Sequence, residues 1–276
     1  MLRIAILDLY EGVTNQGMRC IRDILKEWSE YHRVSLIVDE FEVRLNQEVP
    51  DLSYDIYISS GGPGSPIDSI GSAWEDSWLN WLKSVQDWNH NDQNTNKKFV
   101  FFICHSFQLV CRHLGIGEVS KRKSTAFGVF PVHVLPDGQV DPIFKGLNDP
   151  FYVVDSRDWQ VIHPDLDKLN RMGMKILCIE KYRPHVPYVQ AIMALRLDPY
   201  MIGTQFHPEA DAVGMSMYLQ REEKKKMVIE THGLEKWESM VEHLNDPDKI
   251  MWTYAHIIPN FISLAYKQLK EQMVEN

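Results

Sequence analysis

The sequence predicts an α/β fold, in which helices cover both faces of an open, mostly parallel, doubly wound sheet and an extra helical segment follows at the C-terminal end. Short apolar runs typical of buried strands alternate with amphipathic stretches typical of helices in the first part of the chain. The most continuous apolar run, 99–104, has the character of a central parallel strand covered on both faces. Strand signals become few after residue 210.

The predicted elements follow one another in the order expected for such a sheet. They are a strand at 3–9, a helix over about 15–31, strands near 34–38 and 54–59, a helix over 73–90, and the strand 99–104. Shorter strands follow at about 129–135, 151–155, 175–180, 189–195 and 200–206. These shorter strands predict a partly antiparallel extension of the sheet.

The change of pattern divides the chain into two parts. Residues 1–210 form the predicted α/β domain, and residues 211–276 form a predicted extension of two or three helices. An extension of this size cannot easily bury a core of its own. We therefore expect it to pack on the α/β domain.

The composition restricts the class of function. Of 276 residues, 44% are hydrophobic and 24% charged, as in ordinary globular proteins, which argues against disorder. The net charge of −9 has the wrong sign for a protein that coats nucleic acid or an anionic membrane surface. A small molecule or another protein is the expected partner.

The N-terminal apolar run is too short for a signal peptide and is interrupted by Asp8, and no apolar stretch is long enough to span a bilayer. We therefore expect a cytoplasmic protein. The four cysteines form no CxxC pair, so reduced thiols are expected. No metal site is predicted, because Cys104 and His105 cannot easily converge with Cys111 and His113 at tetrahedral distances on one short helix.

Cys104 is the first candidate for chemistry, because ligands of open α/β sheets bind at the carboxyl ends of the strands. It ends an apolar strand and precedes a segment with helical spacing, which is the context of a nucleophile elbow. A helix N-terminus favours the thiolate, and the backbone N–H of His105, rather than its imidazole, would face the reaction site. Taken alone, an ordinary buried cysteine is the simpler interpretation.

The segment His207-Pro208-Glu209 is the second candidate. The proline favours an extended backbone, in which residues two apart point to the same side. Glu209 can then orient the His207 ring, whose other nitrogen is left to take a proton from Cys104. On its own, such a pair is more commonly a surface pair or a buried, satisfied histidine.

The turn Gly61-Gly62-Pro63-Gly64 is the third candidate. Its glycines allow the backbone to approach a ligand closely, so that Gly62 could supply a second oxyanion donor. No Gly-Lys-Ser/Thr follows, so the turn is not a phosphate-binding loop. Without the other two segments, it would be taken for a plain turn at the end of a strand.

Taken together, the motifs are specific. In chain order they read Ser-Ser-Gly-Gly-Pro-Gly-Ser over 59–65, then Cys104-x-x-x-Gln108, then Pro187-x-x-Gln190-Ala191, then Gly203-x-Gln-Phe-His-Pro-Glu209. In this order along one α/β chain, they resemble the motifs of the class I (triad) glutamine amidotransferase family, and most closely those of the glutaminase portion of GMP synthase and its stand-alone relatives. The resemblance covers roughly residues 1–210.

The resemblance implies a flavodoxin-like fold and a glutaminase with a catalytic triad. Cys104 would form a γ-glutamyl thioester, His207 would act as general base and then acid, and Glu209 would orient it. Gly62 and His105 would supply the oxyanion-hole N–H groups. No cofactor is implied.

The resemblance also implies contacts with the substrate and a partner. Gln108 matches a position that contacts bound glutamine, and Asp155 and Ser156 lie where the family holds the amino-acid end of glutamine. No synthetase domain follows in the sequence, so an acceptor for the ammonia is expected either on a separate protein, such as a synthetase subunit, or not at all.

The sequence departs from the family pattern at the nucleophile. Members of the family have glycine two residues before and two residues after the nucleophile, in the pattern Gly-x-Cys-x-Gly. In this sequence Phe102 and Ser106 occupy these two positions. Because Phe102 is much larger than glycine, it puts the geometry of the nucleophile elbow in question. Three alternatives stay open. They are a stand-alone γ-glutamyl amide hydrolase, which the missing synthetase domain favours, a homoserine-type O-acyltransferase with a related fold and triad, and a non-catalytic regulatory subunit that has lost a working elbow through Phe102.

Overall fold

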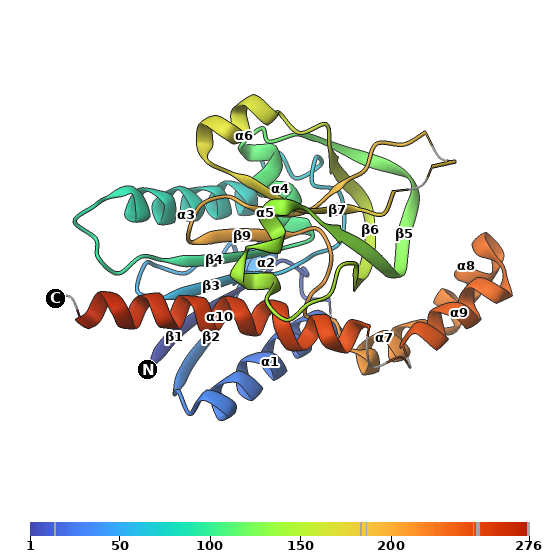
Figure 1. Ribbon diagram of the computed structural model, residues 1–276, viewed down its shortest axis with the longest axis horizontal. Helices are drawn as coiled ribbons and strands as arrows, with labels where there is room; N and C mark the ends of the chain where they lie inside the picture. Colours follow the sequence, from blue (N-terminus) through green and yellow to red (C-terminus); the bar gives the residue numbers. More distant parts are fainter. Residues whose placement is uncertain (14, 183, 186, 245, 247–248, 275–276) are drawn as a thin grey trace.

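A single mixed sheet forms the centre of the molecule (Figure 1). The computed structural model describes residues 1–274 except 14, 183, 186, 245 and 247–248. Within these residues the sheet has nine strands in the order β2-β1-β3-β4-β9-β8-β7-β5-β6. In chain order the strands are β1 (Leu2–Asp8), β2 (Leu36–Glu42), β3 (Ile56–Ser59), β4 (Phe99–Ile103), β5 (Glu118–Val134), β6 (Phe151–Ile162), β7 (Lys175–Glu180), β8 (Ile192–Arg196) and β9 (Met201–Thr204).

The sheet has a parallel half and an antiparallel half. Strands β2, β1, β3, β4 and β9 pair in parallel, and the pairs from β9 through β8, β7 and β5 to β6 are antiparallel. This arrangement confirms the predicted fold class and the antiparallel extension. The parallel register places Ile103 opposite Thr204, so that the residues after β4 and after β9 meet at one edge of the sheet.

Helices cover both faces of the sheet, as Figure 1 shows. In chain order they are α1 (Gln16–His32), α2 (Val43–Asn46), α3 (Ala73–His90), α4 (His105–His113), α5 (Pro136–Gln139), the 3₁₀ helix η1 (Pro142–Phe144), α6 (Leu166–Met172), α7 (Ala212–Leu219), α8 (Glu222–His232), α9 (Leu234–Leu244) and α10 (Ile250–Val274). Helices α1 and α10 share one core cluster with the sheet, and α3 and α4 share the cluster on the opposite face.

Local sequence signals explain where the long helices begin and which face they bury. Asn15 caps α1 by accepting a hydrogen bond from the backbone N–H of Met18 at 2.8 Å. The sequence offers Thr14 as another residue of a type that caps helices, but Thr14 lies outside the described residues. In α3, Trp78 and Trp81 are buried against the sheet, as the helical spacing of the tryptophans predicts.

The strand β5 begins earlier than the predicted strand at 129–135. Its first part, 118–125, is mostly exposed and polar, so it carries no apolar signal, and its pairing with β6 holds it in the sheet. A register shift between Lys121 and Ala126 interrupts that pairing. Tertiary pairing, rather than local sequence, therefore determines where this strand starts.

The C-terminal part contains four helices among its described residues, where the sequence predicted two or three. Short breaks produce the difference: α7 ends before Gln220, and Gly233, at φ 87°, ends α8. Helices α7, α8 and α9 form a third apolar cluster with β5 and β6. Helix α10 contributes its first residue, Ile250, to this cluster and then joins the main core, where Phe261 packs edge-on against Phe101 with ring centroids 5.2 Å apart.

None of the described helices is long and apolar enough to cross a membrane.

Candidate active site

Cys104 occupies a sharp turn between β4 and α4. Its backbone has φ 47° and ψ −94°, a conformation that costs a residue with a side chain about 1–3 kcal/mol. Ser106 braces the turn, because its hydroxyl accepts from the N–H of Ile103 at 2.9 Å and donates to the carbonyl of Ser59 at 2.7 Å. The strand, turn and helix predicted around the cysteine are therefore present.

Phe102, the residue that departs from the family pattern, can be accommodated in the sheet because the residue paired with it on the neighbouring strand β9 has no side chain. The Phe102 ring is fully buried and packs edge-on against Trp78 at 5.9 Å between ring centroids. Gly203 lies opposite it, and a Cβ there would lie 3.3 Å from the Cβ of Phe102 and 2.7 Å from the ring of Phe107. Glycine at position 203 thus makes room for both rings, and the elbow forms with a large residue at position 102.

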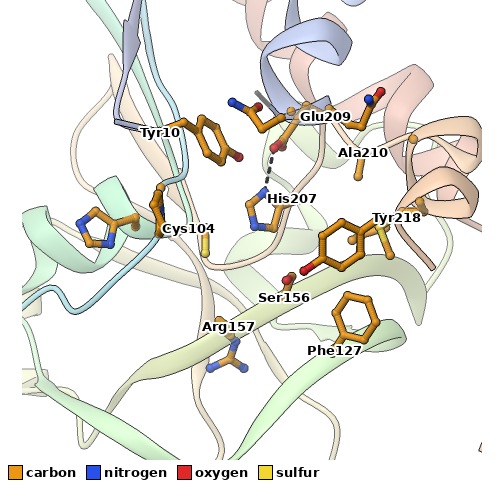
Figure 2. A pocket seen from close by; sticks show the side chains of 18 of the residues that line it. Tyr10, Cys104, Phe127, Ser156, Arg157, His207, Glu209, Ala210 and Tyr218 are labelled. Atoms are coloured by element: carbon orange, nitrogen blue, oxygen red, sulfur yellow. Dashed lines mark hydrogen bonds and ion pairs between the residues drawn. The ribbon is translucent and has the colours of Figure 1, made fainter. Parts of the chain in front are cut away.

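His207 and Glu209 form the expected pair (Figure 2). The His207 Nδ1 lies 2.7 Å from Oε1 of Glu209, whose side chain is buried. The backbone N–H of His207 donates to the carbonyl of Val154 at 2.9 Å, which ties this segment to β6. Gly61 leaves room for the ring, because a Cβ there would lie 2.9 Å from Cε1 of His207.

The electrostatic surroundings favour a charged His207. Burial alone would lower the pKa of His207, but the Glu209 carboxylate and the Cys104 sulfur outweigh burial and raise the pKa well above its usual value. With Nδ1 engaged by Glu209, Nε2 is the ring nitrogen available to the sulfur. The arrangement suits an imidazole that takes a proton from a neighbouring nucleophile and holds it.

Two further residues lie next to these groups, and neither was assigned a role from the sequence, although Gln205 belongs to the motif that ends at Glu209. The Nε2 of Gln205 donates to the Cys104 sulfur at 3.8 Å, and its buried Oε1 has no hydrogen-bond partner among the described residues. Tyr10 lies near Glu209, and burial together with the charges of Glu209 and Cys104 raises its pKa (Figure 2). Their positions after β9 and β1, at the carboxyl edge of the sheet, were the signal that could have identified them.

Gly62 and His105 line the same cavity as Cys104. A Cβ on Gly62 would lie 2.4 Å from the carbonyl oxygen of Leu9, so glycine is required where this turn crosses the end of β1. His105 is the first residue of α4, where backbone N–H groups have no acceptor within the helix. Both residues thus lie at the cavity, on the side where Cys104 and the glycine turn meet.

The imidazole of His105 is unsuited to acid–base chemistry. Burial, reinforced by the charges of Arg44 and Arg112, lowers the pKa of His105 to about 3. Arg44 also supports the glycine turn, because its Nη1 donates to the carbonyl of Pro63 at 2.7 Å. His105 can therefore contribute its backbone N–H but not a titrating ring.

The three predicted substrate contacts differ in position. Gln108 lines the cavity and donates from Nε2 to the carbonyl of Trp159 at 3.2 Å, and Ser156 lines it with an exposed side chain. Asp155 does not line the cavity: its buried carboxylate accepts from Nε of Arg157 at 2.8 Å. Asp155 therefore lies behind the cavity lining, where it forms an ion pair with Arg157, a residue that does line the cavity.

The triad residues, the glycine turn, Gln108 and Ser156 surround one cavity of about 530 Å³. On one side lie the triad residues and the glycine turn. The opposite side, which we call the second wall, comes from β5, β6 and the C-terminal helices. It consists of Phe127, Val154, Met215, Tyr218 and Arg221. Figure 2 labels two of these residues, Phe127 and Tyr218. No sequence motif marked Phe127, Met215 or Tyr218.

The described residues contain no group of three or more His, Cys, Asp or Glu side chains arranged to hold a metal ion. The cysteines other than Cys104 are buried thiols, and burial raises the pKa of Cys111 and Cys178 well above the usual value.

Comparison with known proteins identifies relatives of the chain. The model of the family "Glutamine amidotransferase class-I" matches residues 5–224. Homoserine O-acetyltransferase from Petrotoga mobilis is 28% identical over 171 residues, which cover 60% of this chain and 49% of that protein. The chain thus spans about half the length of this curated relative.

Two solved structures illustrate the likeness of fold. A glutamine amidotransferase from Thermotoga maritima has a TM-score of 0.67 at 14% identity, over 96% of this chain and 98% of that one. The glutaminase domain of Trypanosoma brucei CTPS, with bound acivicin, has a TM-score of 0.59 at 13% identity, over 97% of this chain and 94% of that one. At these identities the structural likeness concerns the fold, whereas the family match covers most of the sequence. The chain therefore belongs to the class I glutamine amidotransferase family.

Proposed function

We propose that the chain hydrolyses the side-chain amide of glutamine through a thioester on Cys104. The observation that carries the proposal is the meeting of a thiol, an imidazole and a buried carboxylate at one cavity, from segments that lie far apart in the sequence. Membership of an amidotransferase family supports the same reaction.

The positions suggest the role of each group. His207 takes the proton of Cys104, and the sulfur attacks the amide carbon of glutamine. The N–H groups of Gly62 and His105 stabilise the negative charge that develops on the amide oxygen. His207 then gives its proton to the leaving ammonia, and a water molecule activated by the same ring hydrolyses the thioester to glutamate.

The ammonia would pass to an acceptor on a separate synthetase subunit. The likeness to the glutaminase portion of GMP synthase stays a prediction about that partner. Co-purification of a synthetase with the tagged chain, together with a rise in glutamine turnover when the two are combined, would support it.

Cys104→Ala is the direct test of the reaction. Glutamate release from glutamine by the purified protein should fall about 10⁵- to 10⁶-fold, as for other nucleophiles of triads. Cys111→Ala, which changes a buried thiol on the same helix, is the matched control and should retain turnover. A glutamine-mimicking chloroketone should add covalently to the peptide that contains Cys104. Glutamate release that survives Cys104→Ala would reject the proposal.

A homoserine-type O-acyltransferase is the second candidate. The homoserine O-acetyltransferase from Petrotoga mobilis matches 60% of the chain, and this observation favours it. Formation of an O-acyl ester from homoserine and an acyl-CoA, without turnover of glutamine, would support this candidate. Absence of both reactions and of labelling at Cys104 would favour a non-catalytic regulatory subunit.

A further inference from the structure

We infer that the second wall forms a subsite for the leaving group and selects γ-glutamyl dipeptides whose second residue is apolar or aromatic, such as γ-glutamylphenylalanine. The inference rests on the proposed function, because it uses the same thioester on Cys104. It assigns a substrate class and the residues that select it.

The position of His207 shows on which side of the sulfur a leaving group lies. The ring that gives a proton to the departing amine has to lie beside that amine. Figure 2 shows Tyr218 and Phe127 across the His207 ring from Cys104, and all four residues line one cavity. A substituent on the departing nitrogen would therefore extend toward the second wall.

The second wall is built to cover an apolar group. The rings of Phe127 and Tyr218 lie 5.4 Å apart between centroids, one from β5 and the other from α7. Val154 and Met215 belong to the apolar cluster behind them. Ammonia, the leaving group from glutamine, would make no use of this surface, whereas an aromatic side chain would bury its ring against it.

The second wall carries a cation next to its aromatic pair. Arg221 lines the cavity, with its guanidinium carbon 5.4 Å from the centre of the Tyr218 ring. Of two carboxylates that also line the cavity, Asp211 is paired with Arg19 at 2.7 Å, whereas Asp158 accepts from the neutral Thr125 hydroxyl and keeps its charge. The carboxylate of a dipeptide thus has a cationic partner in Arg221, whereas the positive charge of a polyamine would be repelled by Arg221.

The size of the cavity agrees with this substrate class. Sites of about 300–1,000 Å³ enclose ligands considerably larger than a single small amino acid. At about 530 Å³, the cavity has room for a glutamyl group and a second residue.

The reaction balances without a further reactant besides water. The sulfur of Cys104 bonds to the γ-carbonyl carbon, the carbon–nitrogen bond breaks, and His207 gives the nitrogen its proton, so that the second amino acid leaves with a free amino group. Water then adds to the thioester carbon and gives a proton to His207, the carbon–sulfur bond breaks, and the proton returns to the sulfur. The products are glutamate and the second amino acid.

The test compares kcat/KM for four compounds: glutamine, γ-glutamylphenylalanine, γ-glutamylphenethylamine, which lacks the second carboxylate, and γ-glutamylputrescine, which is cationic. We expect γ-glutamylphenylalanine to exceed glutamine and γ-glutamylputrescine at least tenfold. Tyr218→Ala should lower the ratio of γ-glutamylphenylalanine to glutamine about tenfold. Arg221→Gln should lower the ratio of γ-glutamylphenylalanine to γ-glutamylphenethylamine by a similar factor.

Met217→Ala is the matched control, because Met217 lies on α7 with an exposed side chain and does not line the cavity. It should leave both ratios as they are. A measurement on the unmodified protein covers variants that fail to fold: free phenylalanine should inhibit competitively at concentrations where putrescine does not.

The possible failures are distinguishable. If glutamine turnover equals or exceeds that of γ-glutamylphenylalanine, the proposed subsite is wrong and the proposed function stays intact. A preference for γ-glutamylputrescine would have the same meaning. Absence of hydrolysis of every γ-glutamyl compound, with no labelling of Cys104, would overturn the proposed function itself.

Discussion

The two sides of the cavity are held in place by different means. On the side of the sulfur, Cys104 follows β4 and His207 follows β9, and the ladder between these two neighbouring strands sets their separation. The second wall instead depends on side chains of β5 and α7 that pack in a separate cluster. Backbone geometry thus positions the groups proposed to carry the chemistry, and side-chain size and charge shape the groups proposed to select the substrate.

If the two sides of the cavity differ in this way, substitutions on the side of the Cys104 sulfur will lower the turnover of every substrate by a similar factor. After removal of the nucleophile itself, Glu209→Gln is expected to have the largest effect on turnover. Loss of the carboxylate leaves the His207 ring without the partner that fixes its tautomer, and kcat should fall about 10³- to 10⁴-fold for glutamine and for any γ-glutamyl amide. Glutamate release with both kinds of substrate is the measurement, and a loss confined to one of them would contradict the contrast.

The same variant has a defined pH signature. Glu209 raises the pKa of His207, so Glu209→Gln should lower it, and the NMR titration of the ring should move to lower pH. The leaving amine needs the imidazolium, so the alkaline limb of kcat/KM should also move to lower pH. A histidine whose pKa is raised by folding adds stability below its unfolded pKa of about 6.5 and loses it as the pH rises through its folded pKa. The loss of stability in the variant should therefore be larger at about pH 6 than at about pH 9.

Gly62→Ala should have the next largest effect. The added methyl group would lie 2.4 Å from the carbonyl oxygen of Leu9, so the turn has to move and its N–H leaves the oxyanion position. Loss of one such donor lowers kcat about 10²- to 10³-fold. Gly64→Ala is a suitable comparison, because a Cβ there would meet only Arg44, at 3.8 Å, although its φ of 90° adds strain. A kcat for Gly62→Ala within twofold of the wild type would remove Gly62 from the proposed oxyanion hole.

Phe102→Ala should have the smallest effect on turnover and a clear effect on stability. It removes a fully buried ring that packs on Trp78, and such changes lower the free energy of unfolding by about 3–5 kcal/mol. Phe102→Leu, which retains much of the volume, should cost less. Denaturant unfolding gives the stability, and kcat of the folded fraction should stay within a fewfold of the wild type. A collapse of kcat at unchanged stability would show that Phe102 acts on the chemistry.

The same contrast explains what could be predicted from the sequence. The positions of Cys104, His207 and Gly62 could be inferred because a strand-to-helix turn, an X-Pro step and a tight glycine turn each leave a local signal. The fold class followed from apolar runs, which burial on both faces of a parallel sheet requires. The roles assigned to these residues stay predictions until the variants are measured.

The remaining features had no local signal. The early start of β5 depends on pairing with β6, and the accommodation of Phe102 depends on Gly203, which lies on another strand far along the chain. Whether Asp155 or Ser156 would face the cavity depended on the register of β6, which places Ser156 toward it and Asp155 against Arg157. Phe127 and Tyr218 meet only through tertiary packing, and an aromatic residue in a strand or helix is most commonly part of a core.

The separate clustering of α7, α8 and α9 has a consequence for the protein under mild stress. A small cluster at the end of a sheet can open at a lower free energy than the central strands, which open only with the whole domain. Moderate urea should therefore release Met215 and Tyr218 from the cavity while β4 and β9 are still paired. Under such conditions the proposed preference between substrates would be lost at a lower urea concentration than the proposed turnover.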